Sequence, residues 1–423
     1  MNQHADILII GAGPAGLAAA LAAAGSGARI VLLDDNPLPG GQIWRDGAQA
    51  RLPAQARRMR EAVENHANIQ RHAATRVVAQ AGSRALLVES PERGWVIDYQ
   101  RLILCTGARE LLLPFPGWTL PGVTGAGGLQ ALIKGGLPVA GQRIVIAGSG
   151  PLLLASAATA KQHGGRVLRI AEQAPLGALA AFAAQLPRWP HKLLQSFGLF
   201  DSGYRSASHV VAALGHERLE GVRLRHNGQD VELECERLAC GFGLIANVQL
   251  GQALGCRLSD SAIAVDTWQA TSVAGLYAAG ECTGFGGSEL ALVEGAIAGH
   301  AAVGERAAAQ RLWPRRQRWQ RFAAALRQTF ALDPALKRLA EPDTLLCRCE
   351  DVPYAAVAAH DNWREAKLAT RCGMGACQGR ICAGAAQQLF GWQPAPPRPP
   401  FAPTRIETLL HLEAAQQTEQ AVQ

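Results

Sequence analysis

The first part of the chain alternates between short apolar runs and glycine-rich turns. Ala5 to Ile10 and Arg29 to Leu33 are mostly apolar runs of strand length, and Leu17 to Ala24 between them contains only alanine and leucine. Short apolar runs bounded by turn residues are typical of buried parallel strands, and the intervening stretch favours a helix. The pattern therefore predicts a strand, a helix and a second strand.

The same order recurs further along the chain. A run from Arg143 to Ala147 is followed by a helical stretch ending at His163 and by a second run from Arg166 to Ile170. Leu290 to Ala302 is also predicted to be helical. Strands that alternate with helices favour an α/β fold with parallel sheets, and 423 residues are enough for two or three domains.

The turn after the first run has the spacing of a dinucleotide-binding GxGxxG loop. It consists of Gly11, Gly13 and Gly16, with Pro14 and Ala15 between them. Glycines there allow a tight turn and let a pyrophosphate approach the helix N-terminus. Asp34 and Asp35 end the second run, about twenty residues past the loop, where a carboxylate would hold a ribose. We favour Asp34 for this role, with Asp35 as the alternative.

The second strand–helix–strand unit carries a degenerate copy of this loop. Gly148 and Gly150 are kept, but Leu153 replaces the third glycine. That glycine normally lets helix and strand pack closely, so the site departs from the pattern. Glu172 follows the unit's second strand and could still hold a ribose. Two interpretations stay open: a vestigial or repurposed pocket, which we prefer, and a working NAD(P) site.

Half of the ten cysteines lie near the C-terminus, on either side of a helical stretch. They are Cys347, Cys349, Cys372, Cys377 and Cys382. Four thiolates suit a small iron–sulfur cluster, and they also close a tetrahedral zinc site. Ligand type alone does not decide between the two metals. The other cysteines are expected to be buried apolar residues.

Composition and charge limit the class of protein. Apolar residues make up 48% and charged residues 18%, as in ordinary globular proteins. The net charge of +7 is concentrated between Arg311 and Arg338, which we interpret as a solvated amphipathic helix; the alternative is a docking face for a partner subunit. No recognition motif for nucleic acid accompanies the charge. We see no signal peptide and no apolar run of membrane-spanning length, so we expect a cytoplasmic protein without a transmembrane segment. Disulfides are rare in the cytoplasm, so clustered cysteines there favour metal or redox roles.

Three further motifs resemble those of the two-dinucleotide-binding flavoprotein superfamily. They are the turn at Gly41 and Gln42, the Thr106-Gly107 pair, and Gly280-Glu281 followed by Glu289 and Leu290 at the start of a helix. The resemblance implies that these residues, with the first glycine loop, bind FAD. Glu281 stands where an aspartate is commoner, and Cys282 beside it is a candidate for a position near the flavin. A helix N-terminus at the flavin would stabilise negative charge on a reduced ring.

The order of motifs over nearly the whole chain resembles the FAD- and iron–sulfur-containing alpha subunit of heteromeric amine dehydrogenases, a family that includes D-hydroxyproline dehydrogenase, opine oxidases and hydrogen cyanide synthase. The C-terminal segment is similar to the bacterioferritin-associated-ferredoxin type of [2Fe-2S] domain. That similarity implies the ligands Cys347, Cys349, Cys372 and Cys377. The second pair, Cys372 and Cys377, has the spacing Cys-x4-Cys, whereas that type of domain has Cys-x2-Cys. Cys382 is therefore an alternative to Cys377 as the fourth cluster ligand.

The resemblance also implies a division of the chain. We expect two parts of an FAD-binding domain (1–115 and 241–310), an inserted NAD-like domain (116–240), a basic helical linker (311–342), a [2Fe-2S] domain (343–392) and a proline-rich tail (393–423). Within the tail, Ile406 to Gln417 is predicted to form a short helix.

The resemblance implies that a beta subunit of such an enzyme, which is FAD-dependent and oxidase-like, oxidises a secondary amine or glycine-like substrate. The alpha subunit then passes the electrons to an acceptor. A small third subunit is a possible further component. We prefer D-hydroxyproline over an opine or glycine. The sequence shows no substrate-binding constellation, and we assign no catalytic residue. Two alternatives stay open: a self-sufficient NAD(P)H-dependent flavin reductase, and a scaffold with a structural zinc knot.

Overall fold

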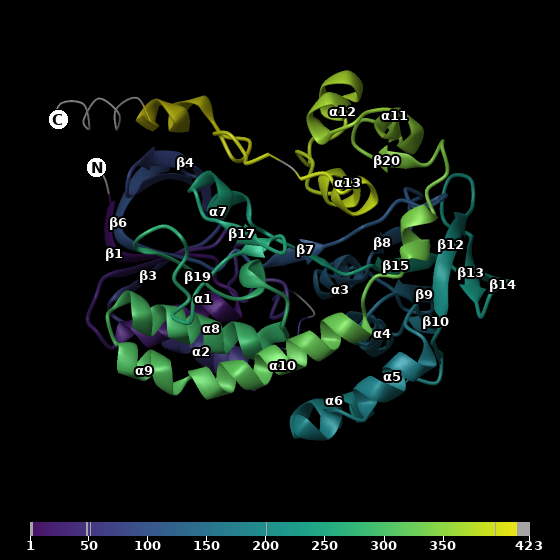
Figure 1. The fold of residues 1–423 in the computed structure, drawn as a ribbon, viewed down its shortest axis with the longest axis horizontal. Helices are drawn as coiled ribbons and strands as arrows, with labels where there is room; N and C mark the ends of the chain where they lie inside the picture. Colours follow the sequence, from purple (N-terminus) through teal and green to yellow (C-terminus); the bar gives the residue numbers. More distant parts are fainter. Residues whose placement is uncertain (1–2, 48–49, 51, 200, 394, 413–423) are drawn as a thin grey trace. The chain divides into compact units, whose positions relative to one another are not determined.

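The computed structural model describes residues 3–47, 50, 52–199, 201–393 and 395–412. They form two compact units, each assembled from segments that are distant in the sequence (Figure 1). The first unit takes its residues from 1–109, 246–324 and 396–423, and the second from 110–245 and 325–395. The finer division made from the sequence stays a prediction.

The first unit is built around a largely parallel sheet with the strand order β3, β2, β1, β6, β5 and β4, to which β19 is added beside β6. Its strands are β1 (Gln3–Ile10), β2 (Ile30–Leu33), β3 (Ile69–His72), β4 (Arg76–Gly82), β5 (Ala85–Glu89), β6 (Gly94–Leu104) and β19 (Leu276–Ala278). Ile10 lies opposite both Leu33 of β2 and Leu104 of β6, so the carboxyl ends of these strands are level. The loops that follow therefore meet at one edge of the sheet, where α/β folds bind ligands.

Two helices of the first unit pack closely on each other: α1 (Pro14–Ala24) and α8 (Gly287–Ala302) lie side by side (Figure 1). A Cβ added at Gly295 or Gly299 would clash with the carbonyl oxygens of Ala15 or Ala19. Glycine in α8 is therefore required by this contact. The sequence pattern predicts that α8 begins at Leu290, and in the structure it begins three residues earlier, at Gly287. The unit also contains α2 (Ala54–Glu64), α7 (Gln249–Ala253), α9 (Arg306–Arg311), β17 (Leu258–Ser259), β18 (Ala262–Ile263) and the 3-10 turn η2 (Glu281–Thr283).

The basic segment is helical, as predicted, but it is divided into α9, α10 (Trp313–Thr329) and the 3-10 turn η3 (Pro334–Arg338). Trp319 and Phe322 are buried, and most arginines of α10 are exposed. This confirms an amphipathic helix. Arg316 is the exception to the prediction of a solvated charged face, since it is only 8% exposed.

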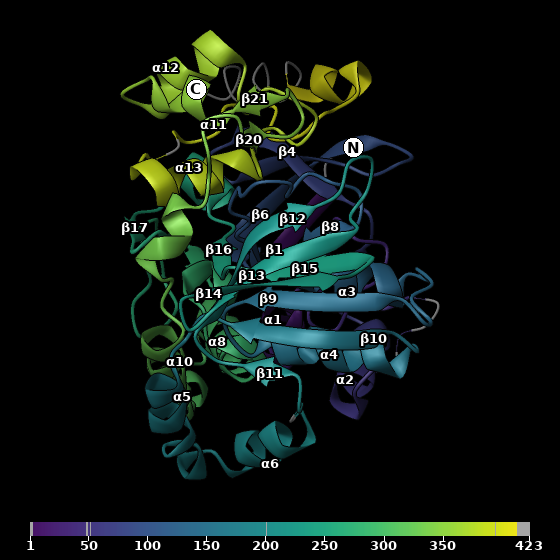
Figure 2. The same cartoon turned by 90° about the vertical axis from the view of Figure 1, so that its right-hand side faces the viewer.

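The second unit contains a five-stranded parallel sheet with the order β11, β10, β9, β15 and β8 (Figure 2). The strands are β8 (Val123–Gly125), β9 (Arg143–Gly148), β10 (Arg166–Glu172), β11 (Tyr204–Arg205) and β15 (Arg237–Gly241), and the antiparallel strands β12 (Ser208–Leu214), β13 (Gly221–His226) and β14 (Gln229–Glu234) form a separate sheet. Its helices include α3 (Ala126–Lys134), α4 (Leu152–Gln162), α5 (Leu176–Ala183), the 3-10 turn η1 (Leu186–Arg188) and α6 (Pro190–Gly198). Both predicted strand–helix–strand units are thus confirmed. The chain passes from one unit to the other four times: within β7 (Ala108–Glu110), at the end of β16 (Leu244–Ala246), within α10, and between residues 395 and 396.

The cysteine-rich segment belongs to the second unit and folds around its own small apolar core, in which Leu346, Val357 and Ala366 are fully buried. It consists of β20 (Leu345–Cys347), β21 (Val352–Pro353), α11 (Tyr354–Ala358), α12 (Trp363–Thr370) and α13 (Cys382–Phe390). Among the described helices, none combines the length and apolar character needed to cross a membrane.

The proline-rich tail packs on the first unit's own sheet. The Phe401 N–H donates to the carbonyl of Val78 in β4, and the Glu89 carboxylate accepts bonds from Arg405 and Thr408. Residues 406–412 are helical, and the rest of the predicted final helix lies outside the described residues.

Candidate functional site

The first glycine loop follows β1 and begins α1. A Cβ added at Gly11 would clash with the carbonyl of Cys105, and one added at Gly16 with the carbonyl of Gly11. At Gly13 the space is open: the Cα of Gly41, 3.8 Å from an added Cβ, is the one described neighbour within reach. Two of the glycines are therefore required by packing, and the third leaves room for a ligand at the helix N-terminus.

The two predicted ribose ligands differ in what they contact. Asp34 is 5% exposed: its Oδ2 accepts the Ala12 N–H at 2.6 Å, and its Oδ1 accepts the Asn36 N–H at 2.8 Å. Asp35 is exposed and accepts a bond from the Asn36 amide at 2.9 Å. Asp34 therefore ties the strand end to the glycine loop, whereas Asp35 faces solvent beside it.

Two motifs distant in the sequence meet the first loop. The Gly40 N–H donates to the carbonyl of Ala12 at 2.7 Å, which holds the Gly41-Gln42 turn against the loop. Gln42 is exposed and accepts a bond from Arg45. The structure thus brings the turn predicted to contact the flavin next to Gly13.

The Thr106-Gly107 pair follows β6 at the same edge of the sheet. The Cys105 N–H donates to the carbonyl of Ile10, and the Thr106 hydroxyl donates to the carbonyl of Asn247 at 2.6 Å. Gly107 has a φ of +66°, and among the described residues other than its two chain neighbours no atom lies within 4 Å of an added Cβ. The pair is therefore fixed in place while its glycine leaves free space.

Glu281 carries the clearest sign of a ligand site. Its Oε1 accepts the N–H groups of Gly287 at 2.8 Å and Gly286 at 3.4 Å, while its Oε2 is buried without a partner among the described residues. Burial raises the pKa of this carboxyl, and the two N–H groups act against the rise. Buried polar atoms nearly always have a partner, so a hydroxyl-rich ligand such as the ribityl chain of FAD fits this oxygen.

The start of α8 completes this site. Glu289 lies in the first turn and accepts a bond from the Ser288 hydroxyl at 3.1 Å. Leu290 is buried against Gly286, where an added Cβ would clash with the leucine side chain. Leu290 therefore packs against the loop that presents Glu281.

One residue of this site escaped the sequence analysis. Glu294 of α8 is buried, and its Oε2 accepts the Gly280 N–H at 3.1 Å and a bond from the Thr283 hydroxyl at 3.2 Å. The signal was present as a single carboxylate within the apolar stretch from Leu290 to Ala302. Carboxylates are almost never fully buried without a partner, so a buried Glu294 indicates a specific structural role.

The five C-terminal cysteines form two groups. The sulfurs of Cys347, Cys372 and Cys382 are buried and lie within 4.8 Å of one another. Cys349 is exposed and interacts with Cys377. A hydrogen bond with Cys372, and then burial, raises the pKa of the Cys382 thiol.

Two glycines of this segment are required by close packing. A Cβ at Gly375 would clash with the side chain of Cys349, and one at Gly373 would come 2.7 Å from the Trp363 ring. The predicted quartet is thus divided between the two groups, and Cys382 joins the buried one. Five sulfurs in one small segment fit a metal or an iron–sulfur centre by donor type.

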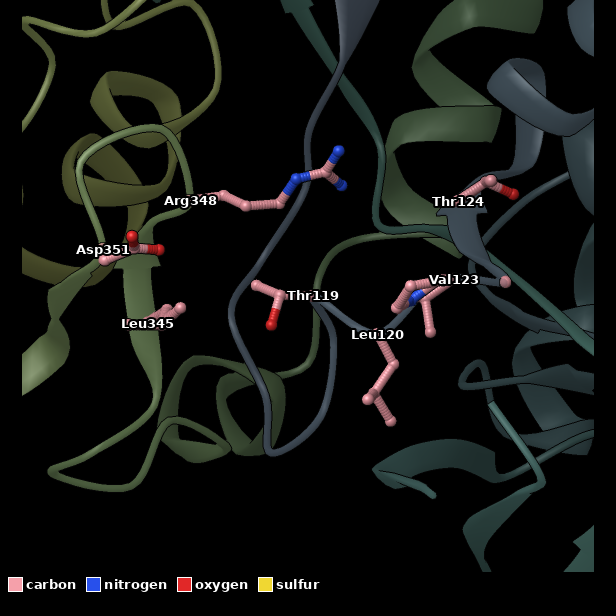
Figure 3. Close-up of a pocket in the computed structure, with 9 residues that line it drawn as sticks. Thr119, Leu120, Val123, Thr124, Leu345, Arg348 and Asp351 are labelled. Carbon is pink, nitrogen blue, oxygen red and sulfur yellow. The ribbon is translucent and has the colours of Figure 1, made fainter. Parts of the chain in front are cut away.

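A cavity of about 490 Å³ adjoins this segment within the second unit (Figure 3). Arg348, which lies between two of the cysteines in sequence, extends into it. Its other lining residues are Leu120, Pro121, Gly122, Val123, Thr124, Leu345 and Asp351. Solvent therefore has room beside the cysteine segment.

In the second glycine-loop unit, the carboxylate of Glu172 binds groups of the protein itself. Glu172 is 0% exposed, and it accepts the N–H groups of Gly150 at 2.7 Å and Ala174 at 3.0 Å and a bond from the Tyr204 hydroxyl at 3.3 Å. Burial raises its pKa. Leu153, in place of the third glycine, is fully buried. Glu172 therefore holds its own loop and does not face an external ribose.

The second loop is also covered by the segment that follows α10. The Ser149 hydroxyl donates to the carbonyl of Phe330 at 3.2 Å, and the Phe330 ring lies 3.8 Å from a Cβ added at Gly150. The Gln173 amide donates to Ala331 and accepts the Asp333 N–H. Residues 330–333, which we call the covering segment, therefore occupy the place where a pyrophosphate would approach this loop.

The remaining cysteines are buried, as predicted. They are Cys105, Cys235, Cys240, Cys256 and Cys282. Burial raises the pKa of Cys235 to about 12 and that of Cys282 to about 11. Thiols with such raised pKa values are inert at neutral pH, so we give none of them a chemical role.

Comparison with known proteins agrees with this geometry. Residues 5–307 match the pyridine nucleotide-disulphide oxidoreductase family. The chain is 32% identical to hydrogen cyanide synthase subunit HcnB from Pseudomonas aeruginosa over 89% of this chain and 90% of that protein, and 32% identical to an opine oxidase subunit from Rhizobium meliloti with the same coverage. The crystal structure of L-proline dehydrogenase from P. horikoshii has the same fold, with a TM-score of 0.68, 20% identity, and coverage of 96% of this chain and 80% of that one.

These matches confirm the two-dinucleotide-binding flavoprotein fold and the family resemblance drawn from the motifs. The chain belongs to the pyridine nucleotide-disulphide oxidoreductase family of flavin oxidoreductases, within the group that contains the hydrogen cyanide synthase and opine oxidase subunits.

Proposed function

We propose that this chain is the FAD- and [2Fe-2S]-carrying electron-transfer subunit of a heteromeric dehydrogenase that oxidises a secondary amine or imino acid. One observation carries the proposal: a flavin-type loop with an unpartnered Glu281 oxygen and a cysteine segment with three buried sulfurs occur in one chain. Relatives at 32% identity are named as subunits of opine oxidase and hydrogen cyanide synthase, which supports a hetero-oligomer.

We assign FAD to the first unit. Gly13 and the start of α1 would face the pyrophosphate, Asp35 the adenosine ribose, and Glu281 the ribityl chain. We prefer Asp35 to Asp34, because Asp35 is exposed, whereas Asp34 is buried and its two oxygens accept the backbone N–H groups of Ala12 and Asn36. When bound, FAD would accept two electrons at once and release them singly.

We assign the iron–sulfur cluster to the three buried sulfurs and one sulfur of the outer pair. The short distances among Cys347, Cys372 and Cys382 support this set over the one that the ferredoxin resemblance implies. A [2Fe-2S] cluster would carry one electron at a time, with a potential set by burial and by hydrogen bonds to sulfur. Zinc at the same residues is the competing assignment, and iron analysis separates the two.

We place substrate oxidation on an FAD-dependent partner subunit, because no substrate-binding group stands out among the described residues near the flavin motifs. D-hydroxyproline is our preferred substrate, with an opine or glycine as alternatives. The covering segment argues against the second candidate function, a self-sufficient NAD(P)H-dependent flavin reductase, since it lies on the loop that NAD(P)H would need.

The test is to purify the full chain alone and together with a co-expressed oxidase-like partner. We expect the complex to reduce a dye with D-hydroxyproline, an opine or glycine, and the lone chain to do so at least 100-fold more slowly (about 2.7 kcal/mol in barrier height). Equal rates for the lone chain would reject the proposal. Zinc without iron in the purified chain would reject the cluster.

A further inference from the structure

Arg45 follows the Gly41-Gln42 turn, and the backbone of this turn is fixed at both ends. The Gly40 N–H donates to the carbonyl of Ala12 at 2.7 Å, and the Trp44 N–H donates to the carbonyl of Gly40 at 3.1 Å. The Trp44 side chain is 6% exposed and belongs to the core that includes residues of α1. Arg45 therefore starts from a fixed position beside the first glycine loop.

A second arginine already supports this turn. Arg60 of α2 is 8% exposed, and it donates to the Asp46 carboxylate at 2.7 Å and to the carbonyl of Trp44 at 2.5 Å. Arg45, by contrast, is partly exposed and bonds side chains. Since Arg60 holds the backbone of the turn, that structural role does not require Arg45.

The guanidinium of Arg45 contacts both segments to which we assign FAD contacts. Its Nη2 donates to the Gln42 side-chain oxygen at 2.9 Å and lies 3.5 Å from the side-chain oxygen of Asn36. The Asn36 amide in turn donates to the Asp35 carboxylate at 2.9 Å. Arg45 thus contacts the turn that meets the glycine loop and the strand end that carries the proposed ribose ligand.

Part of this guanidinium has no acceptor. The Nε of Arg45 is buried and has no hydrogen-bond partner among the described residues. Buried polar atoms nearly always have a partner, and the planar guanidinium is suited to phosphate oxygens. At the Glu281 oxygen the site lacks a donor, and at Arg45 it lacks an acceptor. FAD carries both groups, ribityl hydroxyls and pyrophosphate oxygens.

The charges around the loop also require a cation. Asp34 and Asp35 end β2, and a bound pyrophosphate would add two negative charges nearby. The helix α1 has no charged side chain, and its N-terminus offers only about half a positive charge. Arg45 supplies a full positive charge beside these groups, whereas the charge of Arg60 is paired with Asp46.

We infer that Arg45 is a binding residue for the pyrophosphate of FAD. The inference rests on the proposed FAD site. The guanidinium donates to pyrophosphate oxygens, with Nε as one of its donors, while Gln42 and Asn36 keep the group oriented. A charge-assisted bond of this kind is stronger than one between neutral groups.

The experiment uses full-length apoprotein and FAD. Fluorescence titration should give a dissociation constant about 10- to 100-fold higher in Arg45→Gln than in the wild type, the range for loss of a hydrogen bond to a charged group. Arg58→Gln, which removes an exposed arginine of α2, should bind FAD as the wild type does.

Two further measurements separate binding from support of the turn. Phosphorus NMR of bound FAD reports on the pyrophosphate itself, and we expect its resonances to be displaced in Arg45→Gln and unchanged in Arg58→Gln. Urea unfolding of the apoprotein should give the same midpoint for the wild type and both variants, because Arg60 remains in place.

If Arg45→Gln does not fold, Arg45→Lys provides the second test. It keeps the charge and lacks the planar fork, so we expect a smaller rise in the dissociation constant together with displaced phosphorus resonances. Unmoved resonances in the variant that folds overturn the inference and leave the proposed function intact, as does unchanged affinity in Arg45→Gln. Wild-type protein that binds no FAD rejects the proposed function itself.

Discussion

Ser149 donates a hydrogen bond to the carbonyl of Phe330, so a residue of the second glycine loop is held by one that follows it by 181 positions. Gln173 strengthens the contact by bonding Ser149, Ala331 and Asp333 with one side chain. In a nucleotide-binding unit the loop would offer these positions to a phosphate. Here residues of the chain itself occupy these positions.

Phe330→Ala tests this role of the covering segment. We expect NADH to bleach the flavin of the wild type slowly or not at all, because the segment occupies the loop. Removing the ring opens the space beside Gly150, so nucleotide binding should become measurable. Stopped-flow absorbance and fluorescence of NADH check both. Phe197→Ala, which removes an exposed ring of α6, is the matched control and should behave as the wild type. Rapid bleaching of wild-type flavin would contradict the expectation and favour the reductase.

Cys382→Ser tests the ligand set. We expect this variant to lose the iron and the EPR signal of the reduced protein, since the sulfur lies in the buried group. Cys256→Ser, a buried cysteine of the first unit, should keep both. The set implied by the ferredoxin resemblance makes the opposite prediction: Cys382→Ser would retain the cluster, and Cys349→Ser and Cys377→Ser would each lose it.

Local patterns predicted the elements of this fold well. The apolar runs and glycine loops located β1, α1, β2, β9, α4 and β10 to within a few residues, because each signal is complete within a short window. The cysteine segment and the FAD motifs could be read in the same way, since each is a short run of residues.

What the sequence did not reveal depends on contacts between distant residues. Asp34 and Asp35 are adjacent residues of the same type, so the sequence does not distinguish their roles. In the fold, Asp34 accepts a hydrogen bond from the Ala12 N–H, and Asp35 is exposed. Arg316 lies among other arginines in a segment that the sequence predicts to be solvated. In the structure it is buried, and its guanidinium donates to the carbonyl of Thr267. The covering segment and the grouping of Cys382 with Cys347 likewise arise from tertiary structure.

Asp34→Asn and Asp35→Asn should separate a structural carboxylate from a ligand. Asp34→Asn removes a charged acceptor from two backbone N–H groups, so we expect unfolding free energy to fall by about 1–3 kcal/mol. Asp35→Asn should leave stability within about 0.5 kcal/mol and weaken FAD binding instead. Denaturant unfolding of the apoprotein and fluorescence titration with FAD measure the two effects. A larger loss of FAD affinity in Asp34→Asn, at unchanged stability, would restore Asp34 as the ribose ligand.

Glu281→Ala should weaken FAD binding by about 10- to 100-fold, the range expected when a hydrogen bond to a charged group worth about 1.5–3 kcal/mol is lost. Glu281→Gln should recover part of the loss, because an amide oxygen still accepts from a hydroxyl. Equilibrium titration of the apoprotein with FAD provides the dissociation constants. Unchanged affinity in Glu281→Ala would mean that the unpartnered oxygen does not face the cofactor.

The last prediction concerns the pH dependence of apoprotein stability. Burial raises the pKa of Glu294 from its reference value of 4.5 to about 7. Between these values the folded state holds a proton that the unfolded chain has released, so the contribution of Glu294 to stability falls as pH rises through this window and levels off above it. Other buried carboxyls with raised pKa values, such as Glu172, change stability in the same direction. The comparison of wild type with Glu294→Gln isolates one group, since those carboxyls are common to both proteins. We therefore expect the difference in unfolding free energy between the two to shift in favour of the variant from pH 5 to pH 7, as measured by urea unfolding. A difference that stays constant over this range would mean that Glu294 is ionised throughout, held so by Arg316.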